Sequence, residues 1–121
     1  MAQTQLSNDM QQCIDDCMDC GRICIETASY CLQAGGRHAN AEHIRALLDC
    51  AEICQTSANF MLRASDLHPR TCGVCAEACD ACAASCEQFG DDTQMQACAE
   101  ACRRCAESCR RMAQPARRAA A

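Results

Sequence analysis

The sequence predicts an all-α protein, an antiparallel up-down-up-down four-helix bundle with a cysteine-lined core. Three observations lead to this prediction. The sixteen cysteines of the 121-residue chain follow helical spacing, as in CGVCAEACDACAASC, where successive cysteines lie three or four residues apart. Glycine and proline gather mainly at three breaks, which leave four segments of helical length. Strand signals are missing, with one valine, one tyrosine and no alternating apolar run.

The first two segments are expected at about 7–34 and 40–66. Gly35-Gly36 separates them, and His68-Pro69 follows the second. Alanine and long polar residues, which are good helix formers, occupy the positions between the cysteines. Each segment carries one stripe at heptad-like spacing. The stripes are Met10, Cys13, Cys17, Cys20, Cys24, Thr27 and Cys31 in the first segment, and His43, Leu47, Cys50, Cys54, Ser57 and Met61 in the second.

The other two segments are expected at about 69–89 and 93–113, followed by a frayed tail at 114–121. Pro69 suits a first helical turn, and Gly90 marks the break between the two segments. Thr93 and Gln96 have the spacing of a capping box. The stripes are Cys72, Cys75, Cys79, Cys82 and Cys86 in the third segment, and Met95, Cys98, Cys102, Cys105, Cys109 and Met112 in the fourth.

These stripes occupy the positions that face the interior of a bundle, and short connections favour antiparallel neighbours. We therefore expect a single domain over residues 1–121. In that arrangement one mouth of the bundle gathers Met10, Met61, His68 and Met112. The other mouth gathers His43 and Met95 beside Cys31 and Cys86.

The ordinary core formers are scarce, since valine, leucine, isoleucine and phenylalanine together make up fourteen residues. Either the thiols are the core, or something bound to them helps to hold the fold. The net charge is −5, and every basic residue is arginine. The arginines near the C-terminus are expected to form a solvated helix face, with no nucleic-acid partner. Asp15, Asp16 and Asp19 should form a solvated face too, and His38 should be exposed to solvent.

The N-terminal residues lack the basic and apolar regions of a secretory signal, and no run approaches the ~20 apolar residues of a membrane span. We therefore expect a cytoplasmic protein without a membrane partner, whose thiols stay reduced. Stable disulfides are disfavoured in that compartment. They are also disfavoured within one helix, where the Cβ atoms of such pairs lie ~5–6 Å apart and a disulfide needs about 3.5–4.5 Å.

The thiols therefore suggest a soft metal ion. The spacing does not match the usual iron–sulfur run, and nothing divides the stripes into the closed sets of four that structural zinc prefers. Cu(I) selects soft sulfur ligands, and seven C-x3-C pairs use fourteen of the sixteen cysteines. We expect many Cu(I) ions per chain, held by Cys13, Cys17, Cys20, Cys24, Cys31, Cys50, Cys54, Cys72, Cys75, Cys79, Cys82, Cys86, Cys98, Cys102, Cys105 and Cys109.

These repeated C-x3-C pairs on all four segments resemble those of the cytosolic copper storage proteins, a cysteine-rich four-helix-bundle family, over roughly residues 10–112. The resemblance implies Cu(I) storage and buffering through core thiolates, and assembly as a homotetramer. It also implies a role in ion entry for methionine and histidine at one mouth. Possible entry or auxiliary ligands are Met10, Met61, His68 and Met112, with His43 and Met95 at the other end.

Two alternatives from other classes remain open at this stage. One is a thiol redox protein, which requires one or two thiols far more reactive than the rest. The other is a structural or interaction bundle stabilised by a few zinc ions. No nucleophile and base stand out in the sequence, so we expect no enzymatic activity. A copper chaperone or efflux pump is the partner expected in a cytosolic setting.

Overall fold

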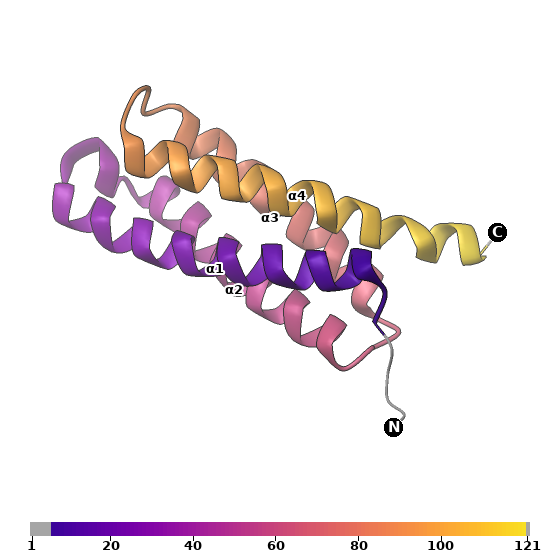
Figure 1. The fold of residues 1–121 in the computed structure, drawn as a ribbon. Helices are drawn as coiled ribbons and strands as arrows, with labels where there is room; N and C mark the ends of the chain where they lie inside the picture. Colours follow the sequence, from indigo (N-terminus) through magenta and orange to yellow (C-terminus); the bar gives the residue numbers. More distant parts are fainter. Residues whose placement is uncertain (1–5, 121) are drawn as a thin grey trace.

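The computed structural model describes residues 6–120, with side chains described for residues 6–114. Four long helices lie side by side and alternate in direction, so that the chain enters and leaves at the same end of the bundle (Figure 1). Each helix packs on the next one along the chain, and α1 packs on α4 to close the ring. The elements are α1 (Asn8–Ala34), the short 3-10 helix η1 (Gly36–Ala39), α2 (Ala41–Leu62), α3 (His68–Glu87) and α4 (Thr93–Ala120). The predicted all-α, up-down-up-down four-helix bundle is confirmed.

Short polar side chains cap the starts of α1, α2 and α4, whereas α3 has no side-chain cap. Ser7 accepts a hydrogen bond from the backbone N–H of Met10, and Asn40 accepts one from Glu42. At α4 the structure differs from the expected capping box of Thr93 and Gln96. Asp92 is the residue whose side chain accepts from the first turn of α4. Its carboxylate is a better acceptor than a hydroxyl and also faces the positive end of the helix dipole.

Two helix ends differ from the sequence expectation. Helix α2 ends at Leu62, short of residue 66, because the chain turns back on itself there. Ala64 has a left-handed backbone (φ 55°), and the Ser65 N–H donates to the Phe60 carbonyl in a Schellman arrangement. Helix α4 runs to Ala120, past residue 113 and into the expected frayed tail. Its last residues are rich in alanine and arginine, which favour helix.

The core of the bundle is made of sulfur. All sixteen cysteines are 0% or 1% exposed, and small alanines such as Ala58, Ala83 and Ala106 fill the space around them. The fully buried large side chains include Leu47, Met61 and Met95, all of which lie on the predicted stripes. The predicted cysteine-lined core is therefore confirmed. Many of the leucine, isoleucine and valine side chains therefore lie away from the bundle axis, and several of them are exposed.

One acidic residue was wrongly expected at the surface. Asp16 is buried between α1 and α4, where its carboxylate accepts hydrogen bonds from the Ser108 hydroxyl (2.8 Å) and the Gln12 amide (3.0 Å). These donors satisfy the oxygen atoms of Asp16 and explain why the carboxylate tolerates burial. The pair also connects α1 to α4 just outside the line of cysteines.

Candidate metal centre

The cysteine side chains of the four helices meet along the bundle axis and form a continuous series of thiols, here called the thiol column. It begins at the end where α1 starts and α4 ends. There the Sγ atoms of Cys13 and Cys17 each lie 3.6 Å from that of Cys109, and Cys17 also lies 3.6 Å from Cys105. The helical periodicity alone puts these residues on the inner face. Their close approach comes from antiparallel packing of α1 against α4.

Halfway along the column, all four walls contribute sulfur. The Sγ atom of Cys20 on α1 lies 3.7 Å from Cys50 on α2, 4.0 Å from Cys79 on α3 and 3.6 Å from Cys102 on α4. The next cysteine of α1, Cys24, lies 4.0 Å from Cys20. These are contact distances between separate thiols, about twice the length of a disulfide bond. All sixteen cysteines are free.

Several groups of four sulfur atoms lie within 4.8 Å of one another, close enough to share metal ions. The groups overlap, because neighbouring sets have members in common. They include Cys17, Cys75, Cys105 and Cys109; Cys54, Cys75, Cys79 and Cys105; Cys20, Cys50, Cys54 and Cys79; Cys20, Cys24, Cys50 and Cys102; and Cys24, Cys82, Cys98 and Cys102. Overlap suits bridging thiolates and clusters of ions. It does not suit isolated tetrahedral zinc sites, each with its own four ligands.

At the opposite end of the bundle, one cysteine lies in a different environment. The Sγ atom of Cys31 lies 3.4 Å from Nε2 of His43 and 3.6 Å from Sδ of Met95, and we call these three residues the Cys31 cluster. Among the described residues, no other thiol forms a hydrogen bond with Cys31. Thr27 and Leu47, both fully buried, occupy the stripe positions between Cys31 and the column on α1 and α2.

Two loops close this end of the bundle through a set of contacts, here called the loop clasp. Phe89 from the α3–α4 loop packs against the rings of His38 and His43, with centroids 4.5 Å and 4.8 Å apart. The Arg37 guanidinium lies over Phe89 and also donates to the Gln88 carbonyl.

A second part of the loop clasp centres on Asp92, whose Oδ2 accepts from the Tyr30 hydroxyl (2.8 Å) and lies 2.9 Å from Nε2 of His38. His38 is therefore partly buried and paired, in contrast to its expected exposure to solvent.

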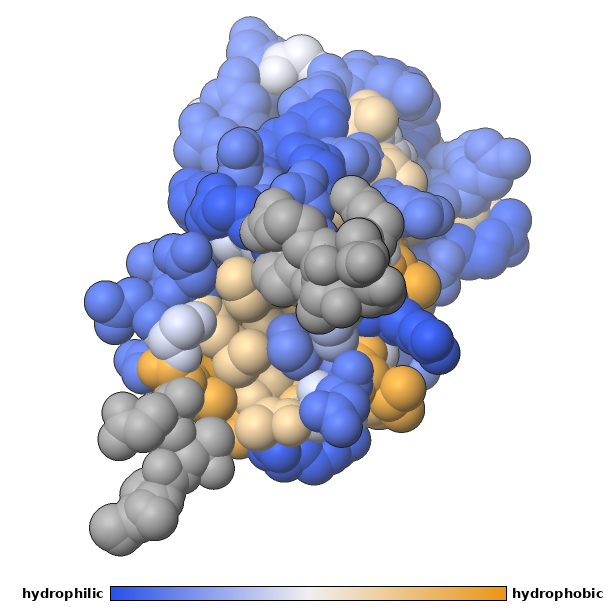
Figure 2. Space-filling view, turned by 90° about the vertical axis from the view of Figure 1, so that its right-hand side faces the viewer, coloured by the Kyte–Doolittle hydropathy of each residue, from blue (hydrophilic) through white to orange (hydrophobic). Residues whose placement is uncertain are grey.

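The four residues predicted at the other mouth, Met10, Met61, His68 and Met112, belong to the end of the bundle where α1 and α3 start and α2 ends. Met61 and Met112 are buried, and Met10 is partly buried against the core. Nδ1 of His68 lies 2.9 Å from the Ser65 carbonyl of its own turn. Figure 2 looks onto this end and shows apolar residues gathered on it among hydrophilic ones. The structure thus brings His43 and Met95 within hydrogen-bond distance of a thiol. In the described part of the chain, no hydrogen bond joins a thiol to Met10, Met61, His68 or Met112, although the three methionines pack in or against the core.

The surroundings of the thiols shift their pKa values in both directions. Burial raises the pKa of Cys31 to about 11. Hydrogen bonds to Cys82 and Cys98 raise the pKa of Cys86 well above its usual range. At other positions in the column, hydrogen bonds from neighbouring thiols stabilise a thiolate and lower its pKa. Hydrogen bonds with Cys102 and Cys20 lower the pKa of Cys50 in this way. Burial lowers the pKa of His43, which favours the neutral ring that can bind a metal ion.

The Cys31 and His43 pair also bears on the redox alternative, because it places a thiol beside a potential base. A reactive cysteine needs a lowered pKa and access to solvent. Cys31 has a raised pKa and is fully buried, so this pair does not have the features of an activated nucleophile.

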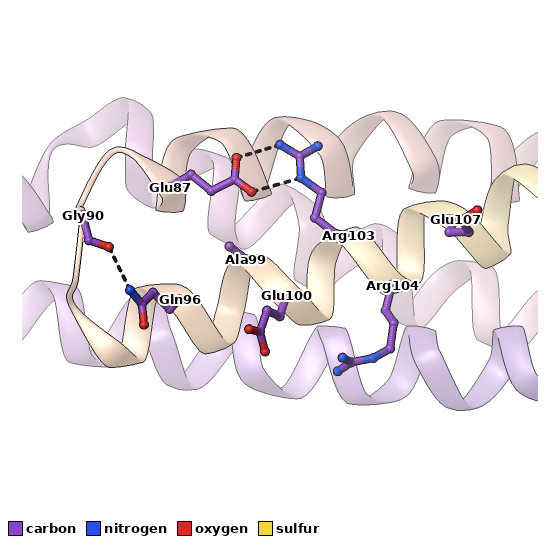
Figure 3. A pocket seen from close by; sticks show the side chains of 8 residues that line it. All are labelled: Glu87, Gly90, Gln96, Ala99, Glu100, Arg103, Arg104 and Glu107. Atoms are coloured by element: carbon purple, nitrogen blue, oxygen red, sulfur yellow. Dashed lines mark hydrogen bonds and ion pairs between the residues drawn. The ribbon is translucent and has the colours of Figure 1, made fainter.

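Outside the core, the surface groove along α4 holds charged side chains that pair with one another. Figure 3 shows Arg103 donating to both carboxylate oxygens of Glu87, and Gln96 donating to the Gly90 carbonyl. Asp80 accepts from Arg103 and Arg110. These arginines belong to an ion-pair network on a solvated face, which agrees with the expectation from the sequence. Within residues 6–120, none of the helices combines the length and apolar character required to cross a bilayer.

Comparison with known proteins places this geometry in context. A family model described as "Copper storage protein" matches residues 6–114. A protein of known structure from Nitrosospira multiformis is 54% identical, with 88% of this chain and 95% of that chain covered and a TM-score of 0.83. Copper storage protein 3 of Bacillus subtilis is 36% identical. The alignment with its Cu(I)-bound structure covers 88% of this chain and 99% of the Bacillus subtilis chain, with a TM-score of 0.81.

A third similar structure is described as a cytosolic copper storage protein from Streptomyces lividans during copper loading. It is 29% identical, with 88% of this chain and 92% of that chain covered and a TM-score of 0.80. No curated protein matches the chain.

Proposed function

Because the chain belongs to the copper storage protein family, we propose that it stores and buffers Cu(I) in the cytosol, with many ions held as cargo inside one bundle. The role is storage through binding, and we propose no catalytic step. The cytosolic location follows the Streptomyces lividans relative, which is described as cytosolic.

The observation that carries this proposal is a set of sixteen buried thiols, most of them in the thiol column, without buried arginine beside them in the described residues. Buried charge is costly unless it is compensated. When a Cu(I) ion replaces a thiol proton, one positive charge replaces another, and the column stays neutral. A divalent ion held by four thiolates would leave a net charge of about −2 in the interior. Neutral exchange and soft sulfur ligands both favour Cu(I).

We propose all sixteen cysteines as ligands. His43 and Met95 are proposed as auxiliary ligands, supported by their contacts of 3.4 Å and 3.6 Å with the Cys31 sulfur. For Met10, Met61, His68 and Met112, an entry or auxiliary role is supported by their position at the other end of the bundle. The distances therefore favour the Cys31 cluster as the stronger candidate for a mixed-ligand site.

We also propose that the chain assembles as a homotetramer, as the family resemblance implies. Met18, Ile25 and Leu48 are about half exposed, and they flank a shallow groove between α1 and α2. Such apolar side chains on a bundle surface suit contact with a second copy. A copper chaperone or an efflux pump is the proposed donor or acceptor of the ions. Light scattering of the purified chain tests the assembly, and Ile25→Arg should reduce the measured mass.

The decisive experiment is an anaerobic Cu(I) titration against a competing chelator. We expect uptake well above the roughly four ions that separate four-cysteine sites could hold. Cys50→Ser should lower the capacity, while Ser57→Ala, a change on the same helix that removes no thiol, should leave the capacity unchanged. Saturation at or below about four ions, with unfolding by a zinc chelator, would instead support the zinc-stabilised bundle.

A further inference from the structure

Ser85 lies on α3, outside the column of cysteines, and touches the one histidine that contacts a thiol. Its Oγ is 2.7 Å from Nδ1 of His43. We propose that Ser85 is a positioning residue for copper, because its hydroxyl fixes the orientation and tautomer of His43 so that Nε2 faces Cys31. This inference rests on the proposed function, and it assigns a role to a side chain that binds no metal itself.

The two ring nitrogens of a neutral histidine have opposite roles, since one carries a proton and the other offers a lone pair. His43 is 4% exposed, so water cannot serve both nitrogens. A serine hydroxyl can donate or accept, and the proposal assigns Ser85 the acceptor role. The proton is then on Nδ1, and the lone pair of Nε2 points to the Cys31 sulfur, 3.4 Å away. The alternative tautomer would direct an N–H group at the position where an ion has to bind.

The arrangement matches the way in which proteins prepare metal-binding histidines. A ligating imidazole usually donates its second N–H to a neighbouring acceptor, which fixes the ring and strengthens it as a ligand. Here Nε2 of His43, Sγ of Cys31 and Sδ of Met95 converge, with sulfur–nitrogen and sulfur–sulfur distances of 3.4 Å and 3.6 Å. Two soft sulfur atoms and one imidazole nitrogen suit a single Cu(I) ion. A thiolate, two neutral ligands and Cu(I) together carry no net charge.

The ring is also held from the solvent side. Phe89 packs on His43 with a centroid distance of 4.8 Å, and Arg37 and His38 hold Phe89 in turn. These contacts restrict the side-chain torsions of His43, but a ring can still flip by half a turn within the same space. The hydrogen bond of Nδ1 to Ser85 and the contact of Nε2 with Cys31 both distinguish the two flipped orientations. Of these two, the bond to Ser85 is the one made by a side chain that binds no metal.

The first test measures the tautomer in the copper-free protein. Long-range 1H–15N NMR at pH 7.5 identifies the protonated nitrogen of each of the three histidines. We expect a proton on Nδ1 of His43 in the unchanged chain, and a mixture of tautomers or a proton on Nε2 in Ser85→Ala. Ser85→Thr keeps a hydroxyl and should restore the original tautomer. A proton on Nε2 in the unchanged chain, or the same tautomer in Ser85→Ala, would overturn the proposal.

The second test measures copper binding at this end alone. The 15N resonance of His43 Nε2 should shift when Cu(I) arrives, and a competing chelator should reverse the shift. In Ser85→Ala we expect a weaker chelator to reverse the shift, because the affinity of this site for Cu(I) should fall by about 10–100-fold. The matched control is Ser57→Ala, which removes a buried hydroxyl 3.3 Å from Cys72 in the other half of the bundle. The control should leave the His43 response unchanged, and an equal effect of both variants would contradict a positioning role.

These readouts separate the two proposals. If the chain took up few Cu(I) ions, the proposed function would fail, yet the tautomer of His43 would still depend on Ser85. If the chain stored many ions but His43 kept its tautomer in Ser85→Ala, the positioning role would fail alone.

Discussion

At the scale of single residues, Asp92 joins three parts of the structure. One carboxylate oxygen caps α4, while the other accepts from the Tyr30 hydroxyl and lies 2.9 Å from His38. The hydrogen bonds from His38 and Tyr30 lower the pKa of Asp92 below its usual value. Asp92 therefore connects α1, η1 and α4 at the end of the bundle that holds the Cys31 cluster.

The lowered pKa of Asp92 predicts an acid-dependent loss of stability. A carboxyl group whose folded-state pKa is depressed stabilises the fold above its unfolded value of about 3.9, and this contribution is lost as the pH falls through the folded-state pKa. Asp92→Asn keeps a capping side chain but does not titrate, so its unfolding free energy should fall less below about pH 4. Urea unfolding between about pH 2 and pH 6 measures the difference. Parallel pH profiles for the two proteins would contradict the prediction.

The sequence predicted the burial of individual residues correctly where helical periodicity alone determines it. Burial of Cys20 or Cys79 follows from helical spacing and the choice of inward face. The hydrogen bond between His43 and Ser85 could not be predicted in this way. It depends on the rotation of α2 relative to α3, and neither residue carries a sequence signal for the other. Burial of Asp16 was missed for the same reason, since its donor Ser108 lies on α4, 92 residues along the chain.

At the scale of the elements, the connection between α1 and α2 depends on Gly35. Its backbone torsions (φ 74°, ψ −169°) lie in a region that is essentially restricted to glycine. The residue caps α1 by donating its N–H to the Cys31 carbonyl and lets the chain turn into η1. The turn therefore positions both Cys31 at the end of α1 and the loop clasp that follows.

Substitution of Gly35 should test this requirement. Gly35→Ala should lower the free energy of unfolding by about 1–3 kcal/mol, because the added Cβ strains the backbone even though it meets no neighbouring atom. Gly73→Ala, inside α3, is the matched control and should raise stability by about 0.5–1 kcal/mol. A Cβ at Gly73 would lie 3.9 Å from Ala113, which is an ordinary contact. Chemical denaturation measures both, and equal effects would argue against the role of the Gly35 backbone.

The α2 wall offers a second test at this scale, because it contributes only Cys50 and Cys54 to the column. Ser57 on the same stripe is buried, with its Oγ 3.3 Å from the Cys72 sulfur. Ser57→Cys should therefore raise the Cu(I) capacity in a chelator competition by about one ion. Thr56→Cys adds a thiol to the same helix off the axis and should not raise the capacity. Equal gains in both variants would show that added thiols count regardless of position.

Element boundaries were the least predictable part of the fold. The α2 end at Leu62 depends on Ala64 in a left-handed conformation, for which the sequence shows no glycine or asparagine signal. At α4 the spacing of Thr93 and Gln96 predicted a capping box, whereas the structure uses Asp92, one residue earlier. The number and direction of the helices were predictable, because the breaks at Gly35 and Gly90 are short and the stripes continue through each segment.

At the scale of the whole molecule, a sulfur core explains how a chain poor in large apolar residues forms a bundle. Buried thiols behave as small hydrophobic groups and make close contacts along the whole axis. Metal binding then adds bonds between all four helices at once, as the four walls around Cys20 illustrate. The stability of the bundle should therefore rise as more Cu(I) ions are bound.

This coupling gives a prediction for the intact protein. A ligand that binds only the folded state stabilises it, so the Tm should rise progressively as Cu(I) is added. After removal of copper by a chelator, the far-UV circular dichroism should keep nearly all its helical signal, because the thiols already pack without metal. The addition of zinc chelators to the copper-free protein should change neither quantity. Collapse of the helical signal on copper removal would contradict a preformed core.

Tyr30 makes the loop clasp visible to a simple optical measurement. It is the only tyrosine of a chain without tryptophan, so the intrinsic fluorescence of the protein comes from the clasp alone. Its hydroxyl donates to Asp92 at 2.8 Å, and a carboxylate acceptor of this kind quenches phenol emission. Opening of the clasp should therefore increase the tyrosine fluorescence. Stopped-flow fluorescence during copper uptake would detect such an opening without any attached dye.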